Sequence, residues 1–400
     1  MAPEPRLLST HFFSPALARN TAIYRLAAVG LVVGVILIFD FATRQVYLGF
    51  KNKSSFPSHS SSPAQKSYRP EHRCPHPVYH HGFVPNSSGT DVFGSTQTTY
   101  FINSVGFRDA KIRSVDHRTP QKRVLLMGDS FAEGIGVPWE ETLAGRLSSS
   151  LAAEGVEVLN GAVASYSPSL ISAKLGYLFD QEKLRADLVV VFIDISDLED
   201  ELNLVAEPEG GFTTKKSSPF DDPRYVTWDQ KFCVWLEKGP EANFTLLGPL
   251  TRKLRQLWRQ AGSPGGTPEL KRASWPEYHG KADALILEGL EKERKSMDQI
   301  ARMTKDHGSR LLVVIYPWLE QVDAGISPSR PEKIWGEWCR AEGVALLNLF
   351  PVFVPMGKNY EKKYCLSGDG HWNSEGHRVV AQALMAKLKD LMMEKEERKN

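Results

Sequence analysis

Five short, almost wholly apolar runs recur from about residue 122 onward, and segments with helical periodicity separate them. The runs are Arg123–Met127, Val156–Leu159, Leu188–Ile193, Leu311–Tyr316 and Val344–Leu349. Such short apolar runs are typical of strands buried on both faces of a parallel sheet. The β-α-β alternation therefore predicts a doubly wound, three-layer α/β/α domain over residues 122–395, with a central five-stranded parallel sheet.

The segments between these runs carry helix signals. Pro138 precedes an expected helix at Thr142–Leu151, and Ser167-Pro168 opens the next one. The last helix is expected to begin at Asn373. An insertion at residues 202–280 is longer than a crossover needs and holds four tryptophans, Trp228, Trp235, Trp258 and Trp275. Their rings suit stacking on sugars, although anchoring a cap in the core is the favoured interpretation.

The N-terminal part predicts a membrane anchor. Residues 22–42 contain an uninterrupted apolar stretch from Leu26 to Phe39, and Arg25 and Asp40 flank it at positions from which they can snorkel. We expect an uncleaved signal anchor; a cleaved signal peptide and a buried helix are the alternatives. The expected organisation is a tail at 1–21, the anchor, a Ser/Pro-rich linker at 43–70 and an extension at 71–121 packed on the main domain.

This organisation predicts a single-pass, membrane-anchored protein with its large domain in the periplasm or outside the cell, although the flanking charges barely decide the orientation. Acidic and basic residues are nearly balanced, with a formal net charge of +2. Nucleic acid is therefore not an expected partner. Four cysteines, Cys74, Cys233, Cys339 and Cys365, permit two disulfides, but the sequence does not pair them.

Candidate catalytic residues lie after the expected strands. Ser130 follows the first strand within Gly128-Asp-Ser, and Asp369 and His371 precede the last helix. In doubly wound sheets the carboxyl ends of the strands form one edge, where ligands bind. These residues thus offer the three groups of a Ser-His-Asp nucleophilic device.

Four blocks carry a family resemblance. Gly128–Ser130, Gly161, Asp194–Asp197 and Asp369–His371 resemble, in order and spacing, the four conserved blocks of the GDSL, or SGNH, hydrolase superfamily. The lead-in Asn103–Asp109 is similar to that of many exported bacterial members. The Asp-x-His-Trp-Asn sequence at 369–373 resembles the subset that acts on exopolysaccharides, including alginate O-acetylating proteins.

The resemblance implies a flavodoxin-like fold with Ser130 as nucleophile, His371 as base and Asp369 as its orienting carboxylate. It also implies an oxyanion hole formed by the N–H groups of Ser130 and Gly161. Ser196 stands where the family usually has Asn, so its hydroxyl is a possible, shorter donor.

Three further residues are expected to support the site: Asp129, Asp197 and His377. His377 is more often a core histidine than a base at such a position. Neither a metal nor a cofactor is expected. Four of the eleven histidines fall within residues 72–81, but their spacing matches no structural zinc pattern, so a surface segment or the start of a strand is favoured.

The function predicted is that of a serine esterase acting on O-acyl groups, such as acetyl, of a carbohydrate or envelope glycan. The first alternative is an O-acetyltransferase that moves an acetyl group to a polysaccharide, because the same triad serves both reactions. The second is a non-catalytic glycan-binding protein or a scaffold in an envelope assembly. The α/β-hydrolase elbow is disfavoured because Ala132 stands where that motif requires glycine.

Overall fold

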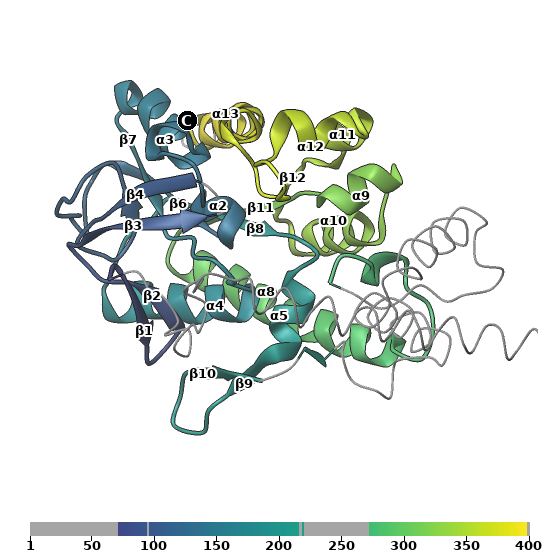
Figure 1. Ribbon diagram of the computed structural model, residues 1–400. Coiled ribbons are helices and arrows are strands. Elements are labelled where there is room, and N and C mark those ends of the chain that lie inside the picture. The colour runs from purple at the N-terminus through teal and green to yellow at the C-terminus, as the bar shows by residue number, and fades with distance from the viewer. Residues whose placement is uncertain (1–70, 94–95, 216–217, 220–271, 398–400) are drawn as a thin grey trace, which may run out of the picture. The chain divides into compact units, whose positions relative to one another are not determined.

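The computed structural model describes residues 71–93, 96–215, 218–219 and 272–397, which belong to one compact unit (Figure 1). The expected tail at 1–21, anchor at 22–42, linker at 43–70 and most of the insertion lie outside these residues. None of the described helices combines the length and hydropathy needed to cross a membrane.

The five expected parallel strands are present and lie side by side. Their order across the sheet is β12 (Ala345–Asn348), β11 (Arg310–Ile315), β8 (Leu188–Ile193), β6 (Lys122–Met127) and β7 (Val156–Asn160). The first strand in sequence, β6, lies between β7 and β8. This is the flavodoxin-like order, and its switch point lies at the carboxyl end of β6, where Ser130 follows.

The sheet is larger than predicted, and it is mixed. Three strands from the N-terminal extension continue it beyond β7 in antiparallel fashion: β5 (Arg108–Asp109), β4 (Thr96–Ile102) and β3 (Ser88–Phe93). The prediction of a five-stranded parallel sheet is therefore wrong in extent. It missed these strands because they pair across turns and alternate in burial instead of forming continuous apolar runs.

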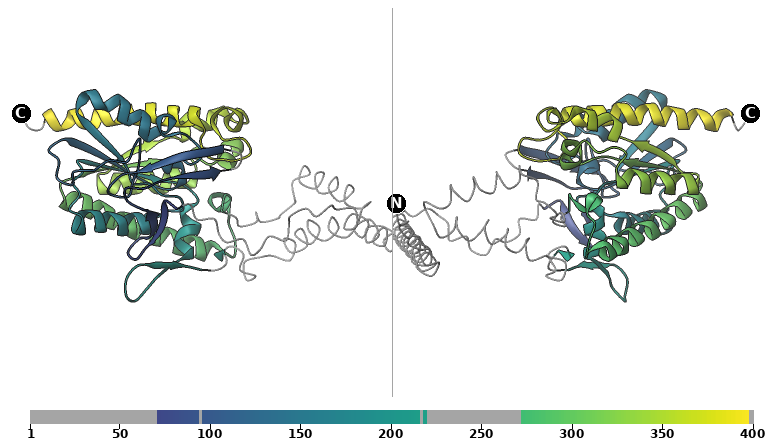
Figure 2. Two further views of the ribbon diagram at one scale, coloured as in Figure 1. Left: turned by 60° about the vertical axis from the view of Figure 1, so that its left-hand side comes forward. Right: turned by 90° about the vertical axis from the view of Figure 1, so that its right-hand side faces the viewer.

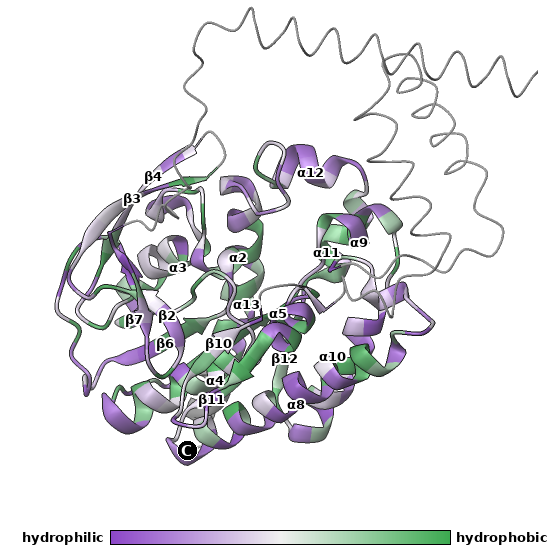
Figure 3. Cartoon of the chain, turned by 60° about the horizontal axis from the view of Figure 1, so that its bottom comes forward, coloured by the Kyte–Doolittle hydropathy of each residue, from purple (hydrophilic) through white to green (hydrophobic). Residues whose placement is uncertain are grey.

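Helices cover both faces of the parallel strands (Figure 2). Alternate strand residues point to opposite faces, so Val124 and Leu126 join one apolar cluster whereas Leu125 and Met127 join the other. The first cluster is covered by α3 (Leu143–Leu151) and α13 (Ser374–Glu397). The second is covered by α4 (Pro168–Gly176), α8 (Asp283–Asp306) and α10 (Arg330–Glu342). In Figure 3 the helices around the sheet alternate between green and purple, as expected of amphipathic helices.

Shorter elements complete the described part of the chain. Two hairpins are β1 (Arg73–His76) with β2 (His80–Phe83), and β9 (Leu204–Ala206) with β10 (Phe212–Thr214). The short helices are α2 (Ser130–Glu133), α5 (Asp197–Asn203), α9 (Leu319–Ala324), α11 (Phe350–Phe353) and α12 (Asn359–Tyr364). Single turns of other helix types are η1 (Trp139–Glu141), η2 (Ala152–Glu154), η3 (Tyr177–Gln181), η5 (Trp275–Glu277) and η6 (Val354–Met356).

The described part of the insertion packs on the main domain through a third apolar cluster. Trp275 is buried there with Leu198 and Leu202 of α5 and Ile286 of α8, and its indole N–H donates to the carbonyl of Ile195 at 2.7 Å. This tryptophan is thus a core residue. Trp228, Trp235 and Trp258 lie outside the described residues, as does Cys233. The other three cysteines, Cys74, Cys339 and Cys365, are free thiols.

Candidate active site

The turn after β6 exposes Ser130 at the start of α2. Gly128 is required there, because a Cβ at this position would come within 2.8 Å of the Phe192 Cβ and 2.9 Å of the Ala132 Cβ. Asp129 caps the helix by accepting the Phe131 N–H at 3.0 Å. The chain therefore turns sharply from strand to helix and leaves the Ser130 side chain partly exposed.

The loop before α13 brings His371 and Asp369 to this serine. Ser130 Oγ lies 2.8 Å from His371 Nε2, and His371 Nδ1 is hydrogen-bonded to Asp369 Oδ1. The backbone N–H of His371 donates to the same carboxylate at 2.8 Å. Because an ionised carboxylate only accepts, Nδ1 carries the ring proton and Nε2 is free to accept from the serine hydroxyl. The three predicted residues form one hydrogen-bonded chain.

Aromatic rings pack against the imidazole of His371, and no sequence pattern predicted these contacts. Phe131 stacks on His371 with a centroid distance of 4.5 Å and an interplanar angle of 29°. Phe93, from the hairpin β3–β4, meets the same ring edge to face at 5.2 Å. Trp372 is fully buried and packs edge to face on Phe131. With Asp369 on one nitrogen, Phe131 stacked on the ring and Phe93 edge to face against it, the imidazole has little rotational freedom.

The predicted oxyanion donors do not all fit. The N–H of Gly161 donates to the Leu126 carbonyl at 2.8 Å, so it continues the pairing of β7 with β6 and is already engaged. Gly161 is needed for packing instead, since a Cβ there would come within 2.8 Å of the Met127 sulfur. The Ser130 N–H has no acceptor among the described residues. The Gly161 N–H is therefore no longer a candidate oxyanion donor, whereas the Ser130 N–H remains one.

Ser196 lies at the N-terminus of α5 and is 1% exposed. Its backbone N–H donates to Asp194 Oδ1 at 2.6 Å. Its hydroxyl makes no hydrogen bond within the described residues. Asp197, also buried, accepts the Asp194 N–H at 2.9 Å and so fixes the turn that carries Ser196. Burial, with the nearby Asp194 and Asp129, raises the pKa of Asp197 well above its usual value.

Asp129 connects the turn at Ser130 to the residues that follow β11. It is 5% exposed and accepts the Tyr316 hydroxyl at 2.9 Å. Burial and the nearby Asp194 raise the pKa of Asp129 well above its usual value. Asp194 itself accepts the Trp318 indole N–H at 2.5 Å, and Tyr316 and Trp318 both pack against Phe131. A buried network thus joins the carboxyl ends of β6, β8 and β11 beneath the candidate triad.

His377 is a buried structural histidine and lies away from the serine hydroxyl. It is 1% exposed, and its Nδ1 accepts the Leu143 N–H at 3.2 Å, which ties α13 to the start of α3. Burial, with Arg108 and Arg146 nearby, lowers its pKa to about 3.

A pH effect on stability follows from His377. The unfolded chain binds a proton on this ring below about pH 6.5, whereas the folded protein does so only below its lowered pKa. Its contribution therefore destabilises the fold as pH falls through that window, by about 1.4 kcal/mol per pH unit at most. His377→Asn keeps an acceptor for Leu143 and removes the titration. We expect urea unfolding at about pH 7 and about pH 5 to show less loss of stability in this variant than in the parent; parallel losses would contradict the assignment.

The described residues contain no group of three or more His, Cys, Asp or Glu side chains arranged to hold a metal ion. Within the histidine-rich segment, His72 is fully buried beside Asp91, with a nitrogen-to-oxygen distance of 3.3 Å. His80 and His81 pair with each other on β2. The segment is thus a strand pair docked on the main domain.

No family model matches the chain, and no curated protein matches it. The solved structures that match include TesA, at 15% identity and a TM-score of 0.35, covering 68% of this chain and 99% of that one. The psychrotrophic esterase EstA from Pseudoalteromonas sp. matches at 12% identity and a TM-score of 0.36, covering 68% and 98%. A lipolytic protein of the G-D-S-L family from Veillonella parvula matches at 9% identity and a TM-score of 0.35, covering 66% and 97%.

The matching structures also include a lipase/acylhydrolase from Enterococcus faecalis, at 12% identity and a TM-score of 0.35, covering 67% of this chain and 96% of that one.

Proposed function

We propose that this protein is a serine ester hydrolase of the SGNH, or GDSL, type. The observation that carries the proposal is the contact of 2.8 Å between Ser130 Oγ and His371 Nε2, with Asp369 bonded to the opposite ring nitrogen. If Gly128–Ser130 were only a structural turn, there would be no reason for a histidine 241 residues further along the chain to hydrogen-bond to the serine hydroxyl. A nucleophile, a base and an orienting carboxylate joined by consecutive hydrogen bonds are the features by which such a site is recognised on any fold.

The proposed reaction proceeds in two steps. His371 Nε2 takes the Ser130 proton as Oγ bonds to the acyl carbon, and Asp369 stabilises the resulting imidazolium. The tetrahedral intermediate then collapses, and the alcohol leaves with the proton from Nε2. In the second step His371 takes a proton from water, whose oxygen attacks the acyl-serine. Collapse of this second intermediate frees the carboxylic acid and returns the proton to Ser130.

The proposed oxyanion donors are the Ser130 N–H and the Ser196 hydroxyl. The amide is fixed by the helix start, whereas a hydroxyl rotates, so the second donor is less rigid than the Asn amide usual in the superfamily. Because the Asp-x-His-Trp-Asn sequence at 369–373 resembles that of proteins acting on acetylated polysaccharides, we propose acetyl esters of carbohydrates as the substrate class. These would lie in the cell envelope if residues 22–42 anchor the chain as expected.

A fluorophosphonate probe tests the proposal. We expect covalent labelling of the full chain that is lost in Ser130→Ala and kept in Ser150→Ala, a control at an exposed serine. Mass spectrometry of the labelled peptide should place the adduct on Ser130. Folded protein that resists labelling would overturn the catalytic assignment and favour a glycan-binding or scaffold role. Product analysis with an acetyl donor and a glycan acceptor then separates hydrolysis from acetyl transfer, since transfer exceeding hydrolysis would identify a transferase.

A further inference from the structure

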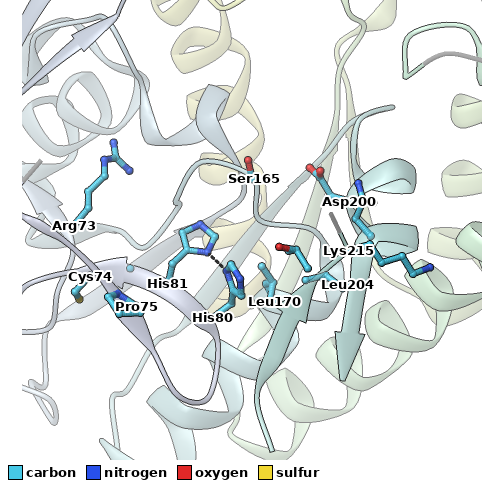
Figure 4. Close-up of a pocket in the computed structure, with 13 residues that line it drawn as sticks. Arg73, Cys74, Pro75, His80, His81, Ser165, Leu170, Asp200, Leu204 and Lys215 are labelled. Atoms are coloured by element: carbon cyan, nitrogen blue, oxygen red, sulfur yellow. Dashed lines mark hydrogen bonds between the residues drawn. The ribbon is translucent and has the colours of Figure 1, made fainter. Parts of the chain in front are cut away.

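A pocket of about 460 Å³ opens beside the loop that follows β7 (Figure 4). Three parts of the chain line it: the hairpin β1–β2, the loop at Ser165 with the start of α4, and α5 with the hairpin β9–β10. In Figure 4, His80 and His81 lie on one side, Asp200, Leu204 and Lys215 lie on the other, and Ser165 lies between them. The volume is within the range of small-molecule sites, about 300–1,000 Å³.

The pocket wall continues into the turn that carries the candidate nucleophile. The Val163 N–H donates to the Gly128 carbonyl at 3.0 Å, and the Ala164 N–H donates to Glu133 Oε2 at 2.7 Å. Gly128 and Glu133 flank Ser130 on either side. Ser165 follows directly in the left-handed conformation, with φ of 63°, and lines the pocket. The loop that lines the pocket at Ser165 is therefore hydrogen-bonded to the turn that carries Ser130.

The charged side chains that line the pocket are already engaged. Arg73 pairs with Asp91 and Glu133, and Asp200 pairs with Arg272 at 2.7 Å. Lys215 Nζ donates to the Leu202 carbonyl at 2.8 Å. A charged ligand would have to compete with these partners, so the pocket does not select for charge.

The imidazole of His81 is neutral. His81 Nε2 lies 2.8 Å from the Ala164 carbonyl, and because a carbonyl only accepts, this nitrogen carries a proton. Burial lowers the pKa of His81 to about 4, so at neutral pH its Nδ1 has none. His80 Nδ1 therefore donates to His81 Nδ1 across 2.8 Å.

Neutral hydrogen-bonding groups remain available in the pocket. Asn203 Oδ1 is buried and has no partner within the described residues. The hydroxyls of Ser165 and Thr214 are likewise without a partner in that part of the chain. The apolar side chains of Leu170 and Leu204 also line the pocket. An unpaired buried acceptor needs a donor, which a ligand hydroxyl supplies, while C–H surfaces cover the leucines.

We propose that this pocket binds a neutral, polyhydroxylated group, the sugar of an acetylated neutral saccharide whose ester lies at Ser130. The inference deepens the proposed function and rests on it for the position of the ester. The Asn203 carbonyl oxygen accepts from one sugar hydroxyl, and Thr214 and Ser165 bond to others.

Two variants test the pocket against one control. Asn203→Leu and Thr214→Val each remove a hydrogen-bonding group from the lining. Thr213→Val is the matched control, since Thr213 is the neighbouring residue of β10 and its exposed hydroxyl donates to Glu207 instead. With mono-O-acetyl cellobiose as substrate we expect each pocket variant to lower kcat/KM by about 10-fold, chiefly through KM. With p-nitrophenyl acetate, which lacks a sugar, all three should stay within about 2-fold of the parent.

A binding measurement separates this inference from the catalytic one. In the Ser130→Ala background, calorimetry with cellobiose reports the pocket without turnover, and adding Asn203→Leu or Thr214→Val should weaken binding by about 10-fold. Unchanged cellobiose binding and unchanged kcat/KM in both pocket variants would overturn the pocket and leave the esterase standing. A preference for an acetylated uronic acid disaccharide over the neutral one would also overturn it. A third outcome would separate the two proposals in the other direction. If the pocket variants weaken cellobiose binding but the parent protein hydrolyses neither ester and is not labelled by the fluorophosphonate, the pocket is upheld and the proposed function is overturned.

Discussion

Replacing His371 with alanine is expected to lower kcat for ester hydrolysis by about 10⁴-fold or more, with the fold unchanged. The serine hydroxyl 2.8 Å from Nε2 would lose the group that accepts its proton. It would then have to attack as a neutral hydroxyl, which is a weak nucleophile. The measurement is steady-state hydrolysis of p-nitrophenyl acetate, with circular dichroism to show that the protein is folded.

Two further variants show whether the loss of activity in His371→Ala is specific to the hydrogen-bonded residues. Asp369→Asn should cost about 10³- to 10⁴-fold, because an amide on Nδ1 neither fixes the tautomer nor stabilises the imidazolium. His279→Ala, at an exposed histidine, should leave kcat as it is. If His371→Ala retained more than about a tenth of the activity, proton transfer would have to occur elsewhere and the triad assignment would fail.

The parallel strands were predictable from sequence because both of their faces are buried. Val124 and Leu126 face one helical layer, and Leu125 and Met127 face the other, so every position must be apolar. A continuous run of this kind is visible without any knowledge of the partners.

The antiparallel strands β3 to β5 carry a weaker signal. In β4 only Thr98, Tyr100 and Ile102 are buried, and β5 has two residues. Half-buried strands carry polar residues on the exposed face, and their pairing depends on turns and register, which one strand's sequence does not specify. The sequence therefore predicts residues 71–121 only as an extension packed on the main domain. In the structure this extension also supplies three strands of the sheet and places Phe93 against the His371 ring.

The hydrogen-bonded arrangement of Ser130, His371 and Asp369 was predictable from sequence, whereas the availability of the proposed oxyanion donors was not. Ser130 and His371 are marked by residue type and by their order at strand ends. The sequence does not show whether the Gly161 N–H is free, because this depends on whether the last hydrogen bond between β7 and β6, to the Leu126 carbonyl, forms. A shift of one residue in the pairing of these strands would decide it. Contacts such as that between Arg73 and Glu133, 60 residues apart, have no local signal at all.

The ion pair between Arg73 and Glu133 holds α2 in place. Its removal has the largest expected effect on stability. Glu133 is fully buried, three residues after Ser130, and it accepts from Arg73, from the Tyr100 hydroxyl at 3.0 Å and from the Ala164 N–H at 2.7 Å. Burial alone would raise the pKa of Glu133, but the Arg73 guanidinium outweighs it, and the pKa lies below its usual value. The carboxylate thus fastens β1, β4 and the loop after β7 to α2.

Glu133→Gln is expected to lower the free energy of unfolding by about 3 kcal/mol, because it removes the fully buried one of the two carboxylates that pair with Arg73 and leaves Asp91 as the remaining counter-charge. Adding Arg73→Met should recover part of this loss, since the two effects are coupled. Urea denaturation at neutral pH measures both, with Glu141→Gln, at an exposed position, as the control.

The lowered pKa of Glu133 also gives the sign of the pH dependence. Its stabilising contribution is present above the unfolded value, about pH 4.5, and is lost as pH falls further. The difference in stability between parent and Glu133→Gln should therefore shrink in acid. A cost below about 1 kcal/mol, or a difference that grows in acid, would mean that the ion pair does not hold α2 in place.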